Sequence, residues 1–320
     1  MTRTAIITGL VAAGALAGCG GGPTRANAQM LIDPASMLGK VALGLAGGGG
    51  GLVRLKQVSH HKRIAGLGGV DIDVWVISAR GGKDRDGEPK APRGTVVLLH
   101  PLLGSKAWFL PLGQTLARRG WHAVLPDLRA HGDSGGKYIT WGAKEKFDLE
   151  MMVDELLLDE VICEPIYAFG ASMGGMVAVQ YAALDHRCRG VMALSPPASL
   201  EAIAERMLPL EPAIEREEAL IEAGLMAGFD PQRASAVRAA SRLDCPLIVA
   251  HGVWDFVVPF GHAKRIYRAA GRPKKFITLP FEGHGAGIGL TLWLAGRIED
   301  LTKMEARVEG PAAWGEGDGG

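Results

Sequence analysis

The chain has 320 residues, 48% of them hydrophobic, which is ample material for the buried core of a single domain. A formal charge of +1, with no basic stripe along the chain, argues against nucleic acid as a partner. The histidines are scattered, and neither His-Glu-x-x-His nor a paired Cys-x-x-Cys occurs, so no metal site is predicted. The adjacent His60 and His61 are a conceivable exception, although their spacing favours a chance surface pair.

The first segment in chain order has the features of an export signal. Residues 1–3 supply a short positive start, and residues 5–17 form an apolar run too short to span a bilayer comfortably. The run ends in Leu-Ala-Gly-Cys, which resembles the lipobox of a bacterial lipoprotein. The resemblance implies cleavage before Cys19 and a lipidated cysteine that anchors the exported chain to a membrane of the cell envelope. Two alternatives remain open, an ordinary signal cleavage site at residues 26–28 and a coincidental cysteine.

Residues 19–53 are predicted to be a spacer between the signal, residues 1–18, and the folded domain. The glycine run at residues 47–51 lacks the Gly-Lys-Ser/Thr ending of a phosphate-binding loop, so a flexible tether is favoured over a nucleotide site. The apolar part of the spacer could rest on a membrane surface or pack on the domain, and the sequence does not separate these two possibilities.

Residues 54–305 alternate short apolar strands with helical stretches, which is typical of an α/β domain with a mostly parallel sheet and helices on both faces. Residues 71–76 alternate polar and apolar side chains, as an edge or antiparallel strand does. Residues 199–244 interrupt the rhythm with a helical insertion, and residues 306–320 are predicted to be a flexible tail. The expected strands are residues 74–77, 96–99, 123–125, 166–169, 191–194, 247–250 and 276–279.

A serine between two glycines follows the fourth of these strands. The motif Gly170-x-Ser172-x-Gly174 precedes a helical pattern at residues 173–184. A sharp strand-to-helix turn crowds the backbone around its central residue, so small neighbours are needed on both sides. The serine hydroxyl at such a turn is held away from the backbone, where it can attack a substrate. An ordinary glycine turn with a serine cap is the alternative interpretation.

A carboxylate and a histidine follow in a consistent order. A serine hydroxyl is a poor nucleophile until a histidine takes its proton, and a carboxylate must orient that histidine. Asp255 lies on a loop just after the strand at residues 247–250, and His284 lies after the next strand. The order Ser172, Asp255, His284, with each residue after a strand, is the order expected of an α/β-hydrolase sheet.

Residues 61–295 as a whole resemble a single-domain α/β-hydrolase of the esterase and prolyl-oligopeptidase-related kind. Residues 100–105, His-Pro-Leu-Leu-Gly-Ser, are similar to the family's His-Gly-x-x-Gly-Ser turn, with Pro101 where a glycine is usual. By this match the backbone amide of Leu102 is one oxyanion donor, and that of Met173 is the other.

Two more segments take their interpretation from the same resemblance. Residues 127–136 are similar to the family's Asp-x-Arg-x-His-Gly-x-Ser loop and are interpreted as structural support beside the site. His131 in this loop is an alternative base, but His284 fits that position better. In these hydrolases an insertion such as residues 199–244 forms a short cap over the acyl pocket, although its Leu and Met stripe is more often plain core.

The resemblance implies a serine hydrolase that cleaves a carboxylic ester or thioester through an acyl-enzyme, without a metal or organic cofactor. Its expected partners are a small ester or acyl substrate and, through Cys19, a membrane. An acyltransferase or a small aminopeptidase would use the same three residues, and a non-catalytic surface binding protein would need none of them. The remaining cysteines are odd in number and are predicted to be buried free thiols: Cys163, Cys188 and Cys245.

Overall fold

The computed structural model describes residues 22–41, 57–82, 86–88, 90–285 and 290–309. The expected signal peptide, Cys19, residues 42–53 of the expected spacer and most of the expected tail lie outside the described residues. No helix in the described ranges combines the length and the hydropathy that a membrane crossing requires. The three described cysteines are free thiols, as expected, but only Cys188 is fully buried.

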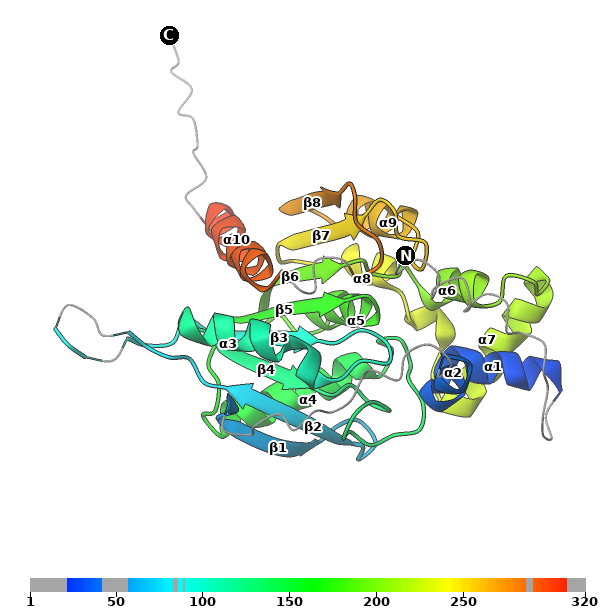
Figure 1. The fold of residues 1–320 in the computed structure, drawn as a ribbon, viewed down its shortest axis with the longest axis horizontal. Coiled ribbons are helices and arrows are strands. Elements are labelled where there is room, and N and C mark those ends of the chain that lie inside the picture. The colour runs from blue at the N-terminus through cyan, green and yellow to red at the C-terminus, as the bar shows by residue number, and fades with distance from the viewer. Residues whose placement is uncertain (1–21, 42–56, 83–85, 89, 286–289, 310–320) are drawn as a thin grey trace, which may run out of the picture.

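An eight-stranded sheet forms the centre of the molecule (Figure 1). The strand order is β1-β2-β4-β3-β5-β6-β7-β8; β2 is antiparallel to both of its neighbours, and all other neighbours are parallel. The mostly parallel sheet and all seven expected strands are confirmed, with β1 rather than β2 at the sheet edge. The strands are β1 (His60–Ala65), β2 (Asp71–Ile77), β3 (Thr95–Leu99), β4 (His122–Pro126), β5 (Ile166–Ala171), β6 (Cys188–Leu194), β7 (Leu247–Gly252) and β8 (Lys274–Leu279).

Helices cover both faces of this sheet, as expected. One face packs against α4 (Glu145–Leu158), α5 (Met173–Ala182), α8 (Ala236–Ala240) and α9 (Gly261–Ala269). The other face packs against the 3-10 helix η3 (Lys106–Phe109), α3 (Leu110–Arg118) and α10 (Thr291–Glu309). Strands β3, β5 and β7 are buried along their whole length, because the side chains on both of their faces meet helices.

The insertion between β6 and β7 is helical, as predicted. It contains α6 (Leu200–Met207), α7 (Ala213–Ala227), the 3-10 turn η4 (Pro231–Arg233) and α8. Ser199 caps α6 by accepting a hydrogen bond from the amide of Ala202, and Gly228 ends α7 at φ 63°, a conformation that glycine adopts readily. Only part of the apolar stripe of the insertion is buried. Leu208 packs in a small apolar cluster, whereas Leu210 and Leu225 are exposed.

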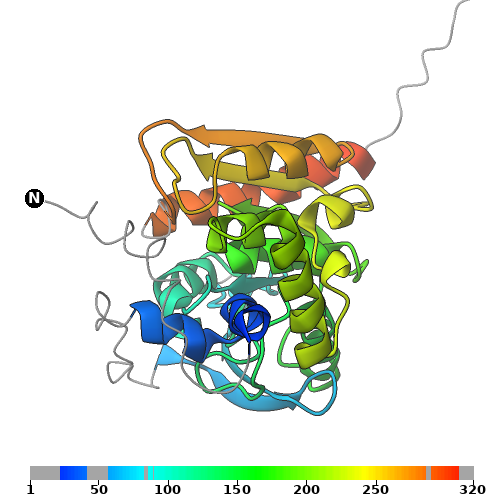
Figure 2. The ribbon, with the colours of Figure 1, turned by 90° about the vertical axis from the view of Figure 1, so that its right-hand side faces the viewer.

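The structure differs from the expected spacer over residues 23–41, which form α1 (Pro23–Ile32) and α2 (Pro34–Val41). Figures 1 and 2 show α1 beside α7, and the fully buried Leu31 and Ile32 pack there in a shared apolar cluster. The indole Nε1 of Trp141 donates a hydrogen bond of 2.7 Å to the Leu31 carbonyl. The apolar residues of α1 lie one helical turn apart among polar ones, so they form one buried face. Residues 23–37 therefore belong to the folded domain.

Candidate active site

Ser172 stands at a sharp turn between β5 and α5, with φ 52° and ψ −121°. A Cβ atom at Gly170 would lie 2.1 Å from the carbonyl oxygen of Gly174, and one at Gly174 would lie 2.2 Å from the carbonyl oxygen of Leu99. Both positions therefore require glycine, as the sequence motif predicts. The Ser172 amide donates a hydrogen bond of 2.8 Å to the carbonyl of Leu194, which helps to hold the strained turn in place.

The structure brings together the three residues that the sequence analysis singled out. The Nε2 atom of His284 lies 2.9 Å from the Ser172 hydroxyl, and its Nδ1 atom lies 2.8 Å from Oδ2 of Asp255. Because the carboxylate can only accept, Nδ1 carries the proton and Nε2 is left as the acceptor that faces the serine hydroxyl. Ser172 is 7% exposed and Asp255 is buried, whereas the His284 ring is partly open to solvent.

Asp255 is held in its charged form by four donors. The amides of Val257 and Val258 donate to Oδ1, and Nδ1 of His284 donates to Oδ2. Nε2 of His251 lies 3.1 Å from Oδ2 and is shared with the Val258 carbonyl, at 2.8 Å. Burial by itself would raise the pKa of Asp255, but the hydrogen bonds from His251 and His284 outweigh it and hold that pKa well below its usual range. His251 is not among the residues predicted for the site; its one sequence signal is its place at the end of β7, four residues before Asp255.

The two predicted oxyanion donors are Leu102, in the loop after β3, and Met173, the first residue of α5. Met173 begins α5, so its amide has no acceptor within the helix. Leu102 lies in a turn closed by a 2.9 Å hydrogen bond from the Gly104 amide to the Pro101 carbonyl. Neither the Leu102 nor the Met173 amide donates to an acceptor in the part of the chain that the structure describes. Both amides are therefore available to an anion.

Two buried histidines hold the turn that carries Leu102. His131 donates from Nδ1 to the Arg129 carbonyl and accepts at Nε2 from the Leu103 amide, so its ring is fully used in structure. His100 likewise donates from Nδ1 to the Pro101 carbonyl and accepts at Nε2 from the amide of Leu128. Burial, followed by the charge of His131, lowers the pKa of His100 to about 3. His100 is therefore neutral at pH 7.

A buried lysine fills the one carboxylate cluster in the described residues whose spacing would suit a metal ion. Asp73, Asp127 and Asp133 place oxygens within 4.8 Å of one another. The Lys106 ammonium lies 2.9, 2.5 and 2.7 Å from these three carboxylates, which is where a cation would otherwise sit. Burial would lower the pKa of Lys106, but the three carboxylates raise it, so the ammonium stays charged. His61 also bonds to Asp73, at 2.9 Å.

The fold is shared with known proteins. A solved structure of the Pyrococcus furiosus esterase Pf2001 matches with a TM-score of 0.60 over 77% of this chain and 92% of that chain, at 22% sequence identity. A family model described as alpha/beta hydrolase fold matches residues 94–236, which include Ser172. The chain has the α/β-hydrolase fold.

The sequence relatives of this chain are distant. It is 27% identical over 213 residues to the protein YqkD of Bacillus subtilis, a match that covers 63% of this chain and 69% of YqkD. It is 28% identical over 241 residues to a monoacylglycerol lipase of Mycolicibacterium smegmatis, and this match covers 63% of this chain and 80% of the lipase. Since one fold serves many reactions, the activity has to be argued from the site.

Proposed function

We propose that this chain is a serine hydrolase that cleaves a carboxylic ester or thioester through an acyl-enzyme intermediate. The observation that carries the proposal is the pair of hydrogen bonds that links Ser172 to His284 at 2.9 Å and His284 to Asp255 at 2.8 Å. In this arrangement a basic nitrogen faces the hydroxyl, and the opposite side of the ring faces a carboxylate that stays charged.

Each group has one role in the proposed reaction. His284 removes the proton of Ser172 as the serine oxygen attacks the carbonyl carbon, and Asp255 stabilises the imidazolium that forms. The amides of Leu102 and Met173 donate to the oxyanion of the tetrahedral intermediate, where losing one donor typically costs about 10²–10³ in turnover. His284 then protonates the leaving group. In the second half of the reaction, His284 takes a proton from a water molecule that attacks the acyl carbon, and it returns this proton to the Ser172 oxygen as the acid leaves.

The surroundings of the site favour an apolar acyl group. Trp254 and Phe256, the neighbours of Asp255 in the chain, are both more than half exposed, and Phe281, three residues before His284, is 90% exposed. Large exposed apolar side chains beside a polar site provide contact area for an apolar ligand. Separately, the names of the similar Mycolicibacterium lipase and Pyrococcus esterase support an ester as the substrate.

The proposal is tested by hydrolysis of p-nitrophenyl esters from acetate to laurate. Ser172→Ala and His284→Asn should each lower kcat by about 10³ or more, because the residues of a triad act as a unit. The matched control is His186→Asn, since His186 also bonds to an aspartate, Asp244, at 2.6 Å but lies on the surface. This control should keep wild-type turnover. Turnover that persists in folded Ser172→Ala protein would refute the proposed mechanism.

The acyl acceptor is tested on the same protein. With esters as donors, release of free acid supports hydrolysis, whereas transfer of the acyl group to an added alcohol or amine indicates an acyltransferase. Cleavage of aminoacyl anilides with no cleavage of esters would replace the esterase proposal by an aminopeptidase. A folded wild type that neither turns over esters or anilides nor reacts with a serine-directed phosphonate would indicate a binding protein.

We also propose that the chain is exported and anchored through a lipid on Cys19. Support comes from the positive start, the apolar run and the Leu-Ala-Gly-Cys sequence that ends it. The alternative cleavage at residues 26–28 would cut within α1, where Asn27 and Ala28 are buried. Mass spectrometry of the mature protein should find an acylated amino-terminal Cys19, and Cys19→Ser should abolish partition into detergent. A mature chain that begins elsewhere would refute the anchor.

A further inference from the structure

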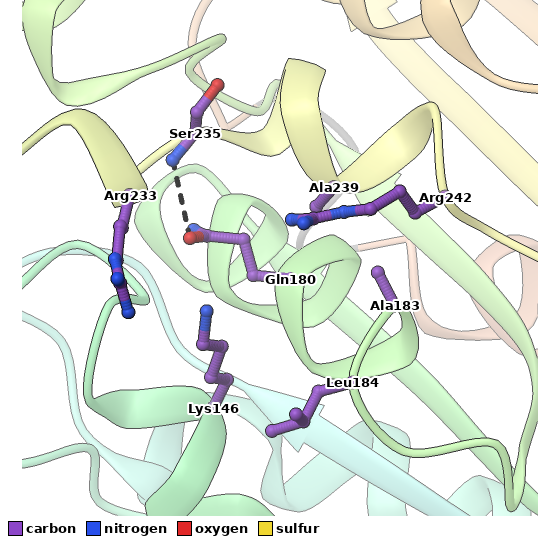
Figure 3. A pocket seen from close by; sticks show the side chains of 8 residues that line it. All are labelled: Lys146, Gln180, Ala183, Leu184, Arg233, Ser235, Ala239 and Arg242. Carbon is purple, nitrogen blue, oxygen red and sulfur yellow. Dashed lines mark hydrogen bonds between the residues drawn. The ribbon is translucent and has the colours of Figure 1, made fainter.

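A cavity of about 180 Å³ lies between α4, α5, η4 and α8 (Figure 3). It is bordered by Gln180, near the carboxyl end of α5, whereas Ser172 stands at the amino end of the same helix. Nothing in the proposed reaction uses this cavity. Figure 3 shows the charged ends of Lys146, Arg233 and Arg242 directed towards its middle, around the Gln180 amide.

Two of the three cations of the cavity have no ion-pair partner among the described residues. No carboxylate lines the cavity, and in the described ranges Lys146 and Arg242 form no ion pair, while Arg233 has only a 3.6 Å contact with Asp230. The neighbouring Glu145 is turned elsewhere, because its two oxygens accept three hydrogen bonds from the loop before α4. Burial, and then the charges of Arg242 and Arg233, lower the pKa of Lys146, as expected of a cation that faces other cations.

Two neutral polar residues complete the wall of the cavity. Ser235 is buried and caps α8 by accepting from the Arg238 amide; Figure 3 shows its backbone nitrogen facing Gln180 and its hydroxyl pointing away from the three cations. Gln180 is buried too; its Oε1 accepts from the Ser235 amide, and its Nε2 donates to the carbonyls of Trp141 and Met176. Gln180 therefore fixes the position of Ser235 against α5.

We propose that this cavity binds a phosphate group, either as orthophosphate or as the monoester of a small molecule. Arginine forks pair with two phosphate oxygens at once, and a lysine supplies a further donor, which suits a compact dianion better than a single carboxylate. Arg233 and Arg242 are exposed at the rim, so the substituent of a monoester can extend into solvent. The site goes beyond the proposed hydrolase activity and does not depend on it.

The test is calorimetric titration of the whole folded protein with inorganic phosphate, with chloride used to hold ionic strength constant. Wild type should bind one phosphate in a saturable manner, and Arg242→Gln and Lys146→Met should each weaken binding about tenfold or more. Arg238→Gln is the matched control, because Arg238 is on α8 and exposed but does not line the cavity. A parallel titration with glycerol 3-phosphate separates the two sources, since the tighter ligand identifies a free phosphate or a monoester.

Thermal unfolding provides the second readout. Phosphate should raise the Tm of wild type and of Ser172→Ala equally, which separates this site from the proposed catalytic one. The proposal is overturned if phosphate and chloride act alike. It is also overturned if Arg242→Gln and Lys146→Met lower the Tm by the same amount with and without phosphate. In that case the cations only offset the partial negative charge at the carboxyl end of α5.

Discussion

Mild acid should destabilise this protein through His100, whose ring holds the turn that carries Leu102. In the folded state burial lowers the pKa of this ring from an ordinary 6.5 to about 3. The unfolded chain therefore takes up a proton as the pH falls below 6.5, while the folded chain does not. Because the pKa is lower in the folded state, His100 contributes stability that is present above pH 6.5 and is lost as the pH falls towards 3.

The size of the loss follows from the width of that window. Well below the unfolded pKa each pH unit costs about 1.4 kcal/mol, and it costs less near pH 6.5, where the unfolded ring is half protonated. Acidification from pH 6.5 to 4.5 therefore removes about 2 kcal/mol through this residue. The full protonation penalty applies because His100 is completely buried. Against a typical total of about 5–15 kcal/mol, this is a large share of the free energy of unfolding.

Urea unfolding of wild type and His100→Asn at pH 7.5, 6.5, 5.5 and 4.5 measures this effect. At pH 7.5 the variant should be less stable by about 1–3 kcal/mol, because the Leu128 amide loses its acceptor. The difference in free energy of unfolding between variant and wild type should then narrow by about 2 kcal/mol between pH 6.5 and 4.5. Other histidines titrate in both proteins and largely cancel, and His186→Asn, on the surface, serves as the control. A gap that stays constant across the series would refute the reasoning.

Three further substitutions, each at a buried position, test the packing of the fold. Gly174→Ala should abolish turnover of p-nitrophenyl esters and destabilise the fold, because the added Cβ would lie 2.2 Å from the Leu99 carbonyl oxygen. In the control Gly296→Ala the added Cβ would meet no atom within 4 Å, so turnover should be unchanged and stability unchanged or improved. Lys106→Met should lower the free energy of unfolding by about 3–5 kcal/mol, because it removes the only buried cation beside the carboxylates of Asp73 and Asp127 in the described residues; a loss below about 1 kcal/mol in urea melts would contradict this. Leu31→Ala should cost about 2–5 kcal/mol in the same assay and the exposed Leu225→Ala almost nothing, and equal effects would show that α1 does not stabilise the domain.

The sequence by itself determined the sheet and the order of the site residues. Apolar runs bounded by turns marked the strands, and the glycines around Ser172 marked a turn that the φ of 52° then explained. The carboxyl ends of parallel strands meet at one edge of a sheet, so Ser172, Asp255 and His284 could be placed together from their positions after strands. Patterns within a few residues of one another carry this information.

Only the tertiary structure decided which distant side chains meet. The packing of α1 on α7, the ion pair of Lys106 with Asp73 and the cavity that gathers Lys146 with Arg242 each join segments with no shared local pattern. A short helix with few apolar residues reads as a spacer until the surface that buries it is known. These contacts depend on burial and distance in the folded chain, and neither quantity is encoded in the spacing of neighbouring residues.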